Sequence, residues 1–514
     1  MDKSVLLTVL ILLHNAVQYV SCIRLNIIPS LDTPCPGEAT EEPCLTLQQY
    51  IANSSFSSWT NITLELHPGE HHLNSRLSAS STNSFTMRAV TTASVLCSPS
   101  SYFSFNQLQH LYISSVAFTG CTMNLNSIMN ASLVKNSFVS TTAGAVNVYR
   151  GRVYIRSSNF SGITAGGYGG AIRVRYGEEV TIDSCYFSNN SAGYTGDAIY
   201  VYNGVSVTIS NSLFINNIIT GAIGVSRGDV TISNSNFSGN GVSTRGYGGG
   251  AVNVNQNEGV NVSIVNCYFS NNAVGGHGGA IYVQSGGQVT IDSCCFSNNS
   301  VGGGGYNGDA IFSSGVTVTI SNSLFKDNTA SGAIGISRGD LTITNSYFLD
   351  NSGADVYLYE GGVNITTSYF SDNAIGGRIA VNIRYGRGVI ISKSYFCDNT
   401  TETNNGHSRA LSIQADGGSI TVTNNTFMKR ASGEGGMPIF PRGHYTSISL
   451  TGNTISYNTT AAYCGLLDVE SYNCHISSTL ATTPQESMFH MQVLVSIATN
   501  LIIITDRVLS CLSL

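Results

Sequence analysis

Residues 278–299 read GGAIYVQSGGQVTIDSCCFSNN, and residues 169–190 read GGAIRVRYGEEVTIDSCYFSNN. The two stretches have the same length and agree at most positions. Self-similarity of this kind is the sequence signature of a repeat architecture, in which each unit buries its apolar face only against its neighbours.

The pattern inside one unit predicts strands. In VTIDSCYF (180–187), apolar and polar residues first alternate, which is the period of a β-strand. Asp183 and Ser184 interrupt the alternation with turn-forming residues, and it resumes up to Phe187. A third short apolar stretch, AIRV or AIYV, precedes the unit after a glycine-rich turn. Three short strands per repeat describe one coil of a parallel β-helix.

The unit recurs fourteen times at a mean spacing of about 26 residues. Weaker copies surround Phe118, Phe138, Phe160 and Phe427, and a last copy has Ile455 in place of Phe. We expect the aromatic rings to stack from coil to coil at about 4.8 Å, and the Asn three residues later to form a side-chain ladder at the bend. The strong copies have their phenylalanines at Phe187, Phe214, Phe237, Phe269, Phe296, Phe325, Phe348, Phe370 and Phe396.

The GGA-[Ile/Val] turn paired with Phe-x-x-Asn resembles the repeats of chlamydial polymorphic outer-membrane proteins. More broadly, it resembles right-handed parallel β-helix proteins, including large secreted ones of simple animals. The resemblance covers residues 110–460 and implies an all-β, right-handed, three-sheet solenoid of about 14 coils. The chlamydial family is implicated in surface adhesion, so the resemblance also implies an adhesive role. The membrane barrel of that family has no counterpart after these repeats.

Composition restricts the function classes. Only 10% of the 514 residues are charged and the net charge is −6, which argues against a nucleic-acid surface. The apolar fraction of 42% excludes wholesale disorder.

The ends divide the chain into four regions. Residues 1–22 have the charge and apolar run of a secretory signal peptide. Residues 23–100 are interpreted as an N-terminal cap and first coils, with a short capping helix within 43–55. The repeat domain spans 101–460, and 461–514 holds a cysteine pair and an apolar tail. A lipid-anchor signal or a marginal membrane segment is an alternative for this tail, but it contains no clear membrane span.

Secretion makes the thirteen cysteines candidate disulfide partners. We predict that the close pairs Cys35/Cys44 and Cys464/Cys474 pin the two ends of the array. The inward parity of Cys185, Cys267 and Cys294 instead predicts buried small side chains. Of twelve Asn-x-Ser/Thr sequons, we predict glycosylation at Asn53, Asn61, Asn130, Asn261, Asn364 and Asn458.

Candidates for catalysis are sparse. A single Gly-His-Gly centres on His277, where other copies have Tyr, and it lacks the Asp pair of pectin-cleaving β-helix enzymes. The paired acids Asp183/Asp292 and Asp197/Asp309 lie in equivalent turns of duplicated blocks. A loop at 401–410 with His407 and Arg409 is the best alternative site.

Two short motifs suggest binding. HPGEHH (67–72) has three histidines, but adjacent strand side chains point to opposite sides, so no metal or cofactor is predicted. The tripeptide RGD, which resembles an integrin-recognition motif, occurs twice. We treat its members as adhesion candidates: Arg227, Gly228, Asp229, Arg338, Gly339 and Asp340.

The sequence therefore predicts a secreted or cell-surface structural and adhesive β-helix protein, with no catalytic site assigned. Its 26 tyrosines suit contacts to an extracellular glycan or a cell-surface protein. A polysaccharide lyase or hydrolase, and an RGD-type integrin ligand, are the alternatives.

Overall fold

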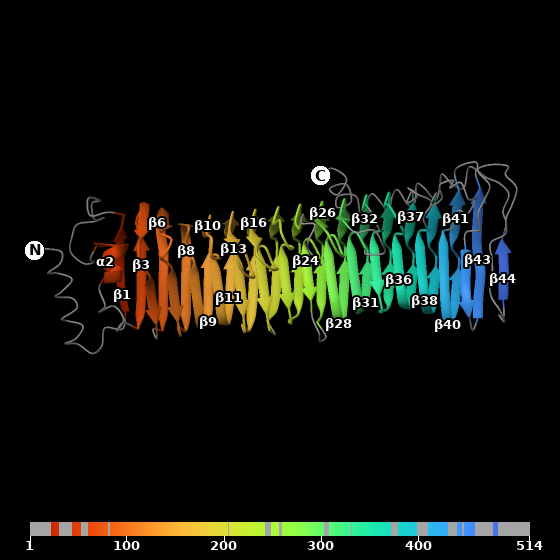
Figure 1. The fold of residues 1–514 in the computed structure, drawn as a ribbon, viewed down its shortest axis with the longest axis horizontal. Coiled ribbons are helices and arrows are strands. Elements are labelled where there is room, and N and C mark those ends of the chain that lie inside the picture. Colours follow the sequence, from red (N-terminus) through yellow and green to blue (C-terminus); the bar gives the residue numbers. More distant parts are fainter. Residues whose placement is uncertain are drawn as a thin grey trace, which may run out of the picture. The chain divides into compact units, whose positions relative to one another are not determined.

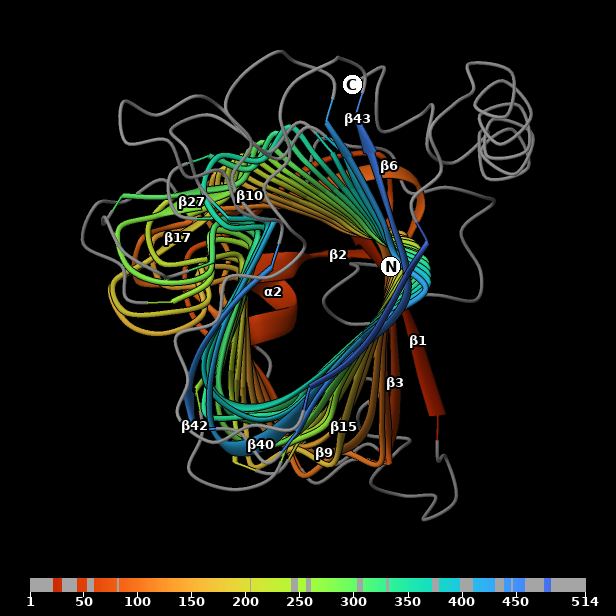
Figure 2. The same cartoon turned by 90° about the vertical axis from the view of Figure 1, so that its right-hand side faces the viewer.

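A computed structural model describes the chain over residues 22–29, 44–52, 60–80, 83–203, 205–241, 248–255, 260–302, 308–329, 332–371, 379–397, 410–429, 439–444, 447–457 and 476–481. The chain divides into two compact units, unit 1 (Met1–Thr231) and unit 2 (Ile232–Leu514). Within each unit the strands follow one another as parallel rungs (Figure 1), and strands of one sheet superpose in the view along the stack (Figure 2).

Unit 1 contains three parallel sheets, here called A, B and C. Sheet A consists of β5 (Leu77–Ser80), β7 (Phe103–Asn106), the first parts of β9 (Met123–Val134) and β11 (Val146–Arg156), β14 (Ile172–Arg175), β18 (Ile199–Tyr202) and β21 (Ile223–Ser226). Sheet B consists of β1 (Cys22–Ile28), β3 (Asn61–Leu66), the first parts of β6 (Ser84–Cys97) and β8 (His110–Thr119), the second parts of β9 and β11, β15 (Glu179–Asp183) and β19 (Ser206–Ser210).

Sheet C of unit 1 consists of β4 (Gly69–Leu73), the second parts of β6 and β8, β10 (Ser137–Val139), β12 (Asn159–Ser161), β16 (Tyr186–Ser188) and β20 (Leu213–Ile215). A minor pair, β13 (Thr164–Ala165) and β17 (Ser191–Ala192), extends two coils. β22 (Val230–Ser233) lies at the division between the units.

Unit 2 repeats the three-sheet arrangement. Its sheet A comprises β24 (Val252–Asn255), β33 (Ile334–Ser337), β42 (Ile439–His444) and the first parts of β28 (Ile281–Asp292), β31 (Ile311–Ser321), β36 (Val356–Thr366), β38 (Val381–Ser392) and β40 (Leu411–Thr423). Its sheet B comprises the second parts of these long strands with β25 (Val262–Val265), β34 (Leu341–Thr344), the first part of β43 (Ser447–Tyr457) and β44 (Ile476–Ala481). The last part of β43 pairs with β41 in sheet C.

Sheet C of unit 2 comprises β23 (Asn236–Ser238), β26 (Tyr268–Ser270), β29 (Cys295–Ser297), β32 (Leu324–Lys326), β35 (Tyr347–Leu349), β37 (Tyr369–Ser371), β39 (Tyr395–Cys397) and β41 (Thr426–Lys429). A minor pair joins β27 (Ala273–Val274) and β30 (Ser300–Val301). The expectation of an all-β parallel β-helix with three sheets is confirmed.

A short N-terminal helix is present as predicted. β2 (Cys44–Thr46) pairs with β1, and α2 (Leu47–Ala52) follows it directly. Leu47 and Tyr50 of α2 are buried, and in Figure 2 the helix lies within the outline of the coils. We interpret α2 as a cover for the apolar interior at the start of unit 1. No helix among the described residues is long and apolar enough to cross a membrane.

Stacked phenylalanines fill the interior against sheet C. In unit 1, Phe160 lies 5.0 Å from Phe138 and 4.9 Å from Phe187, measured between ring centroids, and the rings are nearly parallel. Phe187 in turn lies 4.8 Å from Phe214. In unit 2 the stack runs from Phe237 through Phe269, Phe296, Phe325, Phe348, Phe370 and Phe396 to Phe427, with spacings of 4.7–5.1 Å. These spacings are those of hydrogen-bonded strands, so strand pairing dictates the ring contacts.

The predicted asparagine ladder is also confirmed. In unit 1, the Nδ2 of Asn190 donates to Oδ1 of Asn217 at 3.0 Å and to the carbonyl of Phe160 at 3.1 Å. In unit 2, the same amide contact links Asn240, Asn272, Asn299, Asn328 and Asn351 in order. All these amides are buried, and their mutual hydrogen bonds offset the cost of burying polar groups at a bend.

Removing one phenylalanine ring should show how much the stack contributes to the free energy of unfolding. Phe160→Ala is expected to lower the free energy of unfolding by about 3–5 kcal/mol, because it leaves a cavity between two fully packed neighbours. Urea denaturation measures this loss. The control Tyr186→Ala removes an exposed ring from the next coil and should cost less than about 1 kcal/mol. Equal losses for the two variants would contradict a stability carried by the inner stack.

Candidate functional site

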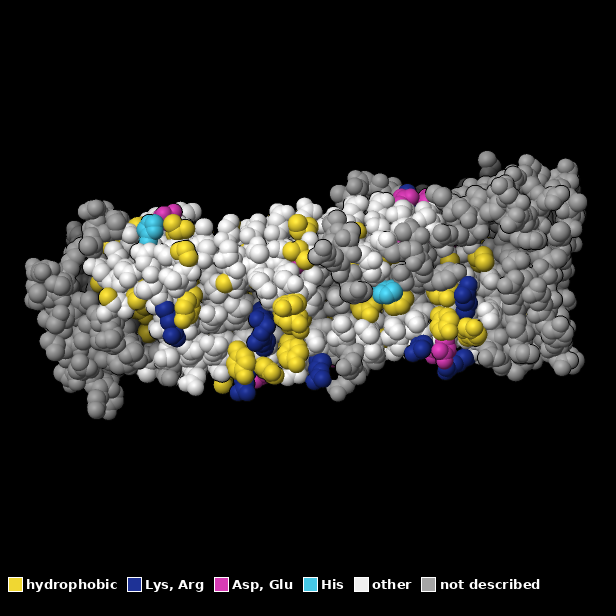
Figure 3. Space-filling view, viewed as in Figure 1, with side chains coloured by type: hydrophobic (Ala, Val, Ile, Leu, Met, Phe, Trp, Pro, Cys, Tyr) yellow, Lys and Arg dark blue, Asp and Glu magenta, His cyan; other side chains and the backbone are white. Residues whose placement is uncertain are grey.

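Aromatic and basic side chains gather on the outer side of sheet A in unit 1. Side chains alternate along a strand, so β14 and β18 send their apolar residues inward and their tyrosines and arginines outward. Figure 3 shows hydrophobic-coloured side chains, which include tyrosine, interspersed with Lys and Arg on the face of unit 1 in view. We call the following set the tyrosine–arginine face: Tyr149, Arg150, Tyr168, Arg173, Arg175, Tyr176, Tyr194, Tyr200 and Tyr202.

Strand register aligns the tyrosines in this face. The ring of Tyr176 lies 5.4 Å from Tyr149 on one side and 6.0 Å from Tyr202 on the other, in edge-on contacts. In a second group, Tyr168 stacks 4.5 Å from Tyr200 and 4.9 Å from Tyr194. Tyr194 remains 62% exposed, so the group has open ring surface.

The corner after each sheet A strand positions some of these side chains. Arg150, at the bend within β11, and Tyr176, directly after β14, have left-handed backbone with φ of 66° and 54°. Asn203 and Arg227 lie at the same corner of the next coils, with φ of 72° and 70°. This conformation has a higher conformational energy for most residues other than Gly and Asn. Tyr and Arg at these corners therefore reflect something other than local backbone preference.

The arginines are held against the rings. The guanidinium of Arg173 lies 5.7 Å from the centroid of Tyr168, and that of Arg150 lies 5.4 Å from the centroid of Tyr149. Such cation–π contacts hold a guanidinium group against a ring. The Nε atom of Arg173 is buried and has no hydrogen-bond partner. A planar polar ligand could stack on the rings and hydrogen-bond to the arginines.

A related cluster occurs in unit 2 over β36 and β38 (Figure 3). Tyr359 and Tyr385 lie 5.2 Å apart, and both are exposed. Here Glu360 is paired with Arg387 at 2.7 Å and with Arg338 at 3.6 Å. This cluster has its own internal carboxylate.

The first RGD tripeptide forms the corner between β21 and β22. Arg227 and Asp229 are exposed. A Cβ on Gly228 would lie 1.9 Å from the carbonyl oxygen of Val205, so close packing against the preceding coil already explains this glycine.

The second RGD tripeptide occupies the equivalent corner of unit 2. Arg338 pairs with Glu360, and Oδ1 of Asp340 accepts a hydrogen bond from the N–H of Gly362 at 2.7 Å. A Cβ on Gly339 would lie 2.0 Å from the carbonyl oxygen of Val316, so close packing explains this glycine as well. Both charged groups are engaged by the next coil, and a role in integrin recognition stays a prediction.

His277 occupies a position like that of Tyr168 in unit 1. Its ring stacks 4.6 Å from Phe312 and 6.2 Å from Tyr282. The structure therefore gives this Gly-His-Gly histidine a stacking role. His407 and Arg409 lie outside the described residues.

The histidines of HPGEHH (67–72) lie in different environments. His71 is buried and its Nε2 lies 2.8 Å from the carbonyl of His67, while His72 faces outward, 3.3 Å from Glu70. Burial lowers the pKa of His71. Among the described residues, no three His, Cys, Asp or Glu side chains form a group that could hold a metal ion.

A shallow groove of about 550 Å³ lies beside this region in unit 1. Its charged lining residues are Glu70 and Lys135, and hydroxyl groups supply most of the rest. One carboxylate and one ammonium group do not make the pair of carboxylates that glycoside hydrolysis usually uses.

The candidate acids Asp197 and Asp309 hold the fold together. Asp197 is fully buried, and its carboxylate accepts hydrogen bonds from the N–H groups of Ala192, Ile219, Thr220 and Gly221. Burial raises the pKa of Asp197. In unit 2, Asp309 likewise accepts from the N–H of Gly332 at 2.7 Å. Both side chains tie down a turn of the next coil and present no carboxylate to solvent.

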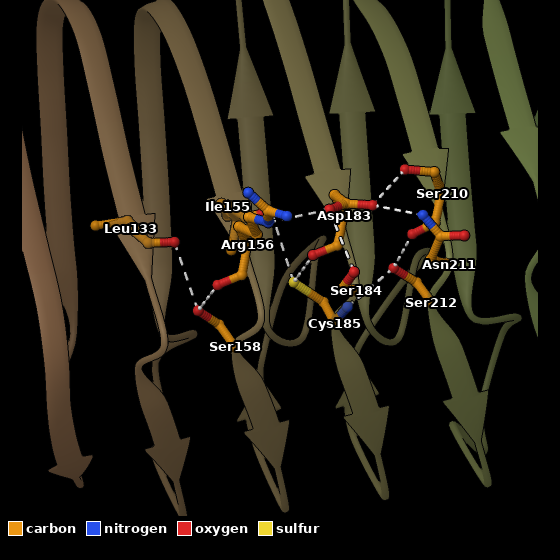
Figure 4. Close-up of polar contacts among 10 residues, drawn as sticks. All are labelled: Leu133, Ile155, Arg156, Ser158, Asp183, Ser184, Cys185, Ser210, Asn211 and Ser212. Carbon is orange, nitrogen blue, oxygen red and sulfur yellow. Dashed lines mark hydrogen bonds and ion pairs between the residues drawn. The ribbon is translucent and has the colours of Figure 1, made fainter.

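Asp183 belongs to a ladder of polar corner residues (Figure 4). Its Oδ1 accepts hydrogen bonds from Asn211 Nδ2 and Ser210 Oγ, both at 2.8 Å, and Oδ2 lies 3.3 Å from Nε of Arg156. Hydrogen bonds from Asn211, Ser210 and Ser184, together with the charge of Arg156, lower the pKa of Asp183.

Asp292 repeats this arrangement in unit 2. Burial alone would raise its pKa, but hydrogen bonds from Ser321, Asn322 and Ser293 lower it overall. A carboxylate that stays ionised and is fully hydrogen-bonded to its own corner suits a structural role.

The inward cysteines occupy serine positions of a second ladder. Figure 4 shows Ser158, Cys185 and Ser212 in successive coils, and the N–H of Cys185 donates to Ser212 Oγ at 3.1 Å. Burial raises the pKa of Cys185 to about 12, so its thiol is unreactive at neutral pH. In unit 2, Cys267 and Cys294 are likewise free, buried thiols, with the N–H of Cys267 directed at Cys294 Sγ.

The sequence analysis did not predict the disulfide between Cys97 and Cys121, whose Cα atoms lie 5.1 Å apart at the ends of neighbouring coils. Cys295 is disulfide-bonded as well. Cys35, Cys464 and Cys474 lie outside the described residues, as does the side chain of Cys44. The two predicted end pairs therefore stay predictions.

The predicted glycosylation sites differ in accessibility. Asn130 and Asn261 are exposed, whereas Asn61 and Asn364 are partly buried in strands. Asn61 accepts a hydrogen bond from Ser84 at 2.7 Å. Asn53 and Asn458 lie outside the described residues. Glycan attachment stays a prediction, with Asn130 and Asn261 in the more accessible positions.

The lowered pKa of Asp183 implies acid-sensitive stability. Since its folded pKa lies below the unfolded value of about 3.9, the contribution is present above that pH and disappears as pH falls through the folded pKa. Asp183→Asn should therefore lower the free energy of unfolding by about 1 kcal/mol at pH 7 and by almost nothing near pH 2. Urea denaturation across this range tests it. The exposed Glu179→Gln on the same strand is the control, and a pH-independent loss in Asp183→Asn would contradict the assignment.

The chain was compared with known proteins. The solved structures that resemble this chain include the alginate lyase AlyF-OU02 (10% identity, 72% of this chain and 86% of that chain, TM-score 0.36). They also include a mannuronic-acid-specific polysaccharide family 6 lyase from human gut microbiota (11% identity, 88% and 89%, TM-score 0.32). No curated protein matches the chain. The family described as "Right handed beta helix region" matches residues 100–276, 197–333 and 309–481. With most of its length matched, the chain belongs to the right-handed β-helix family.

Proposed function

We propose that this protein is a secreted or cell-surface β-helix protein that binds glycans, and that the tyrosine–arginine face of unit 1 is its binding surface. The observation that carries the proposal is the alignment of exposed tyrosine rings with outward guanidinium groups on consecutive coils. Aromatic side chains offer large contact area with few rotatable bonds, and a hydroxyl for hydrogen bonding.

The shape of the face supports a polymeric ligand. Tyr149, Arg175 and Tyr202 follow one another in strand register, so the face repeats at the spacing of neighbouring strands, about 4.8 Å. A polysaccharide is likewise a repeat of similar units and could contact several coils at once. The weak contact at each rung would then add up along the chain, as it does for linked binding modules.

Neighbouring coils of sheet A show which residues can replace the tyrosines without disturbing the fold. Asn126 precedes Tyr149 in the same register position, and Asn203 follows Tyr176 at the same corner. Tyr149→Asn/Tyr176→Asn therefore removes two rings while using residues that neighbouring coils already tolerate. Each ring contact is worth about 0.5–1.5 kcal/mol, so the double variant should bind its glycan about tenfold more weakly.

The measurement is a panel of polysaccharides assayed both for bound protein and for newly released sugar ends. Tyr154→Thr is the matched control, because Tyr154 is similarly exposed on sheet B and Thr181 occupies its place in the next coil. The proposal predicts binding that the double variant loses and the control retains. Binding that both variants retain, or no binding to any glycan, would overturn it. Release of sugar ends would favour the alternative of a carbohydrate-active enzyme.

A further inference from the structure

We infer that the tyrosine–arginine face selects acidic polysaccharides, whose sugars carry carboxylate or sulfate groups. The inference rests on the proposed glycan binding and concerns its ligand class. It comes from the charges on the face, which the ring contacts alone do not explain.

Three guanidinium groups on the face lack a carboxylate partner. Within the described part of the chain, no Asp or Glu lies within ion-pair distance of Arg150, Arg173 or Arg175. Arg173 and Arg175 both point outward from β14, two residues apart, and Arg150 lies at the corner of the preceding coil. Three like charges held this close raise the local positive potential.

The nearby carboxylates lie on a different sheet. Glu179 begins β15 of sheet B, and Glu178 lies in the corner directly before it, paired with Arg152 at 2.9 Å. Asp183, further along β15, is paired with Arg156. Glu178 and Asp183 therefore pair with arginines of sheet B, and neither lies within ion-pair distance of the three arginines of the face.

The unit 2 cluster provides the contrast. It also combines tyrosines with arginines, but Glu360 lies among them and pairs with Arg387 and Arg338. A protein that needed arginines only to pack on tyrosine rings could use this compensated arrangement in both units. The missing carboxylate in unit 1 is what points to an anionic ligand.

Guanidinium groups suit carboxylate and sulfate oxygens, because they present N–H donors in a planar fork. The rings beside them suit the apolar faces of a sugar. A nucleic acid would supply anions and rings as well, but the chain carries a net charge of −6 and has no lysine on this face. An acidic polysaccharide fits both kinds of group.

The test uses the secreted chain and ligands that differ only in charge. Polygalacturonate is compared with its methyl ester, and dextran sulfate with dextran. We expect the acidic member of at least one pair to bind about tenfold or more tightly than its neutral partner, with affinity falling as salt is added. Whichever pair shows this effect identifies carboxylate or sulfate as the preferred group.

The variants assign the effect to the face. Arg173→Gln/Arg175→Gln should weaken binding of the acidic ligand about tenfold and flatten its salt dependence, while weakening binding of the neutral ligand much less. Arg152→Gln makes the same chemical change at an arginine that already has a carboxylate partner, so its affinity should stay within about twofold. Unfolding curves that match the parent chain show that the variants fold.

The outcomes separate the two proposals. Equal binding of neutral and acidic partners, sensitive to Tyr149→Asn/Tyr176→Asn but not to the arginine variants, would overturn the acidic selectivity and leave glycan binding standing. Binding to double-stranded DNA as tight as to the acidic glycans would also overturn it. An absence of binding to every polysaccharide would overturn both.

Discussion

Hydrogen bonding between parallel strands of consecutive coils is the constraint on which the rest of each unit depends. It fixes the spacing, so rings such as Phe160 and Phe187 stack 4.9 Å apart and amides such as Asn190 and Asn217 meet end to end. Neither contact forms within a single coil. The interior is therefore a product of stacking, and a coil has little stability without its neighbours.

The same register produces the outer surface. Because strand side chains alternate, the inward phenylalanines and aliphatic residues leave every second position free to vary without disturbing the core. In sheet A of unit 1 those positions hold aligned tyrosines and arginines. In sheets B and C many are occupied by Ser, Thr and Asn. The fold presents outward positions at regular spacing, and the tyrosines and arginines at those positions make sheet A of unit 1 a candidate binding surface.

Much of the architecture could be predicted from sequence, because inward residues repeat. The alternation in VTIDSCYF predicts which side chains face the core, and the Asn after each Phe predicts where the chain bends. The place of Cys185 in a ladder of serines was harder to predict. From sequence alone, an inward-facing cysteine is interpreted as a small apolar residue, and its hydrogen bonds with backbone and Ser212 appear only in the structure. The Cys97–Cys121 disulfide joins two of the least regular coils, where the repeat gives no reliable register.

The tyrosine–arginine face was missed for a different reason. Aligning AVNVYRG, AIRVRYG and AIYVYNG on their shared turn would have brought Tyr149, Arg175 and Tyr202 together. The positions of Tyr168 and Tyr194 depend instead on turn conformation, which has no simple period. The absence of a carboxylate partner for Arg173 could be seen only in the structure. Glu178 and Glu179 follow Arg173 closely in sequence, but they lie beyond the corner, where Glu178 pairs with Arg152 and Glu179 begins a strand of sheet B.

Hydroxyl-radical footprinting can show whether a polysaccharide binds on sheet A of unit 1 and leaves the other two sheets uncovered. Tyr149 and Tyr176 on sheet A are 40% and 43% exposed, while Tyr154 on sheet B and Tyr186 on sheet C are 37% and 38% exposed, so all four should oxidise similarly in the free protein. With a bound polysaccharide, we expect Tyr149 and Tyr176 to be protected from oxidation and Tyr154 and Tyr186 to be oxidised as before. Protection of Tyr154 and Tyr186 with Tyr149 and Tyr176 still oxidised would contradict binding on sheet A.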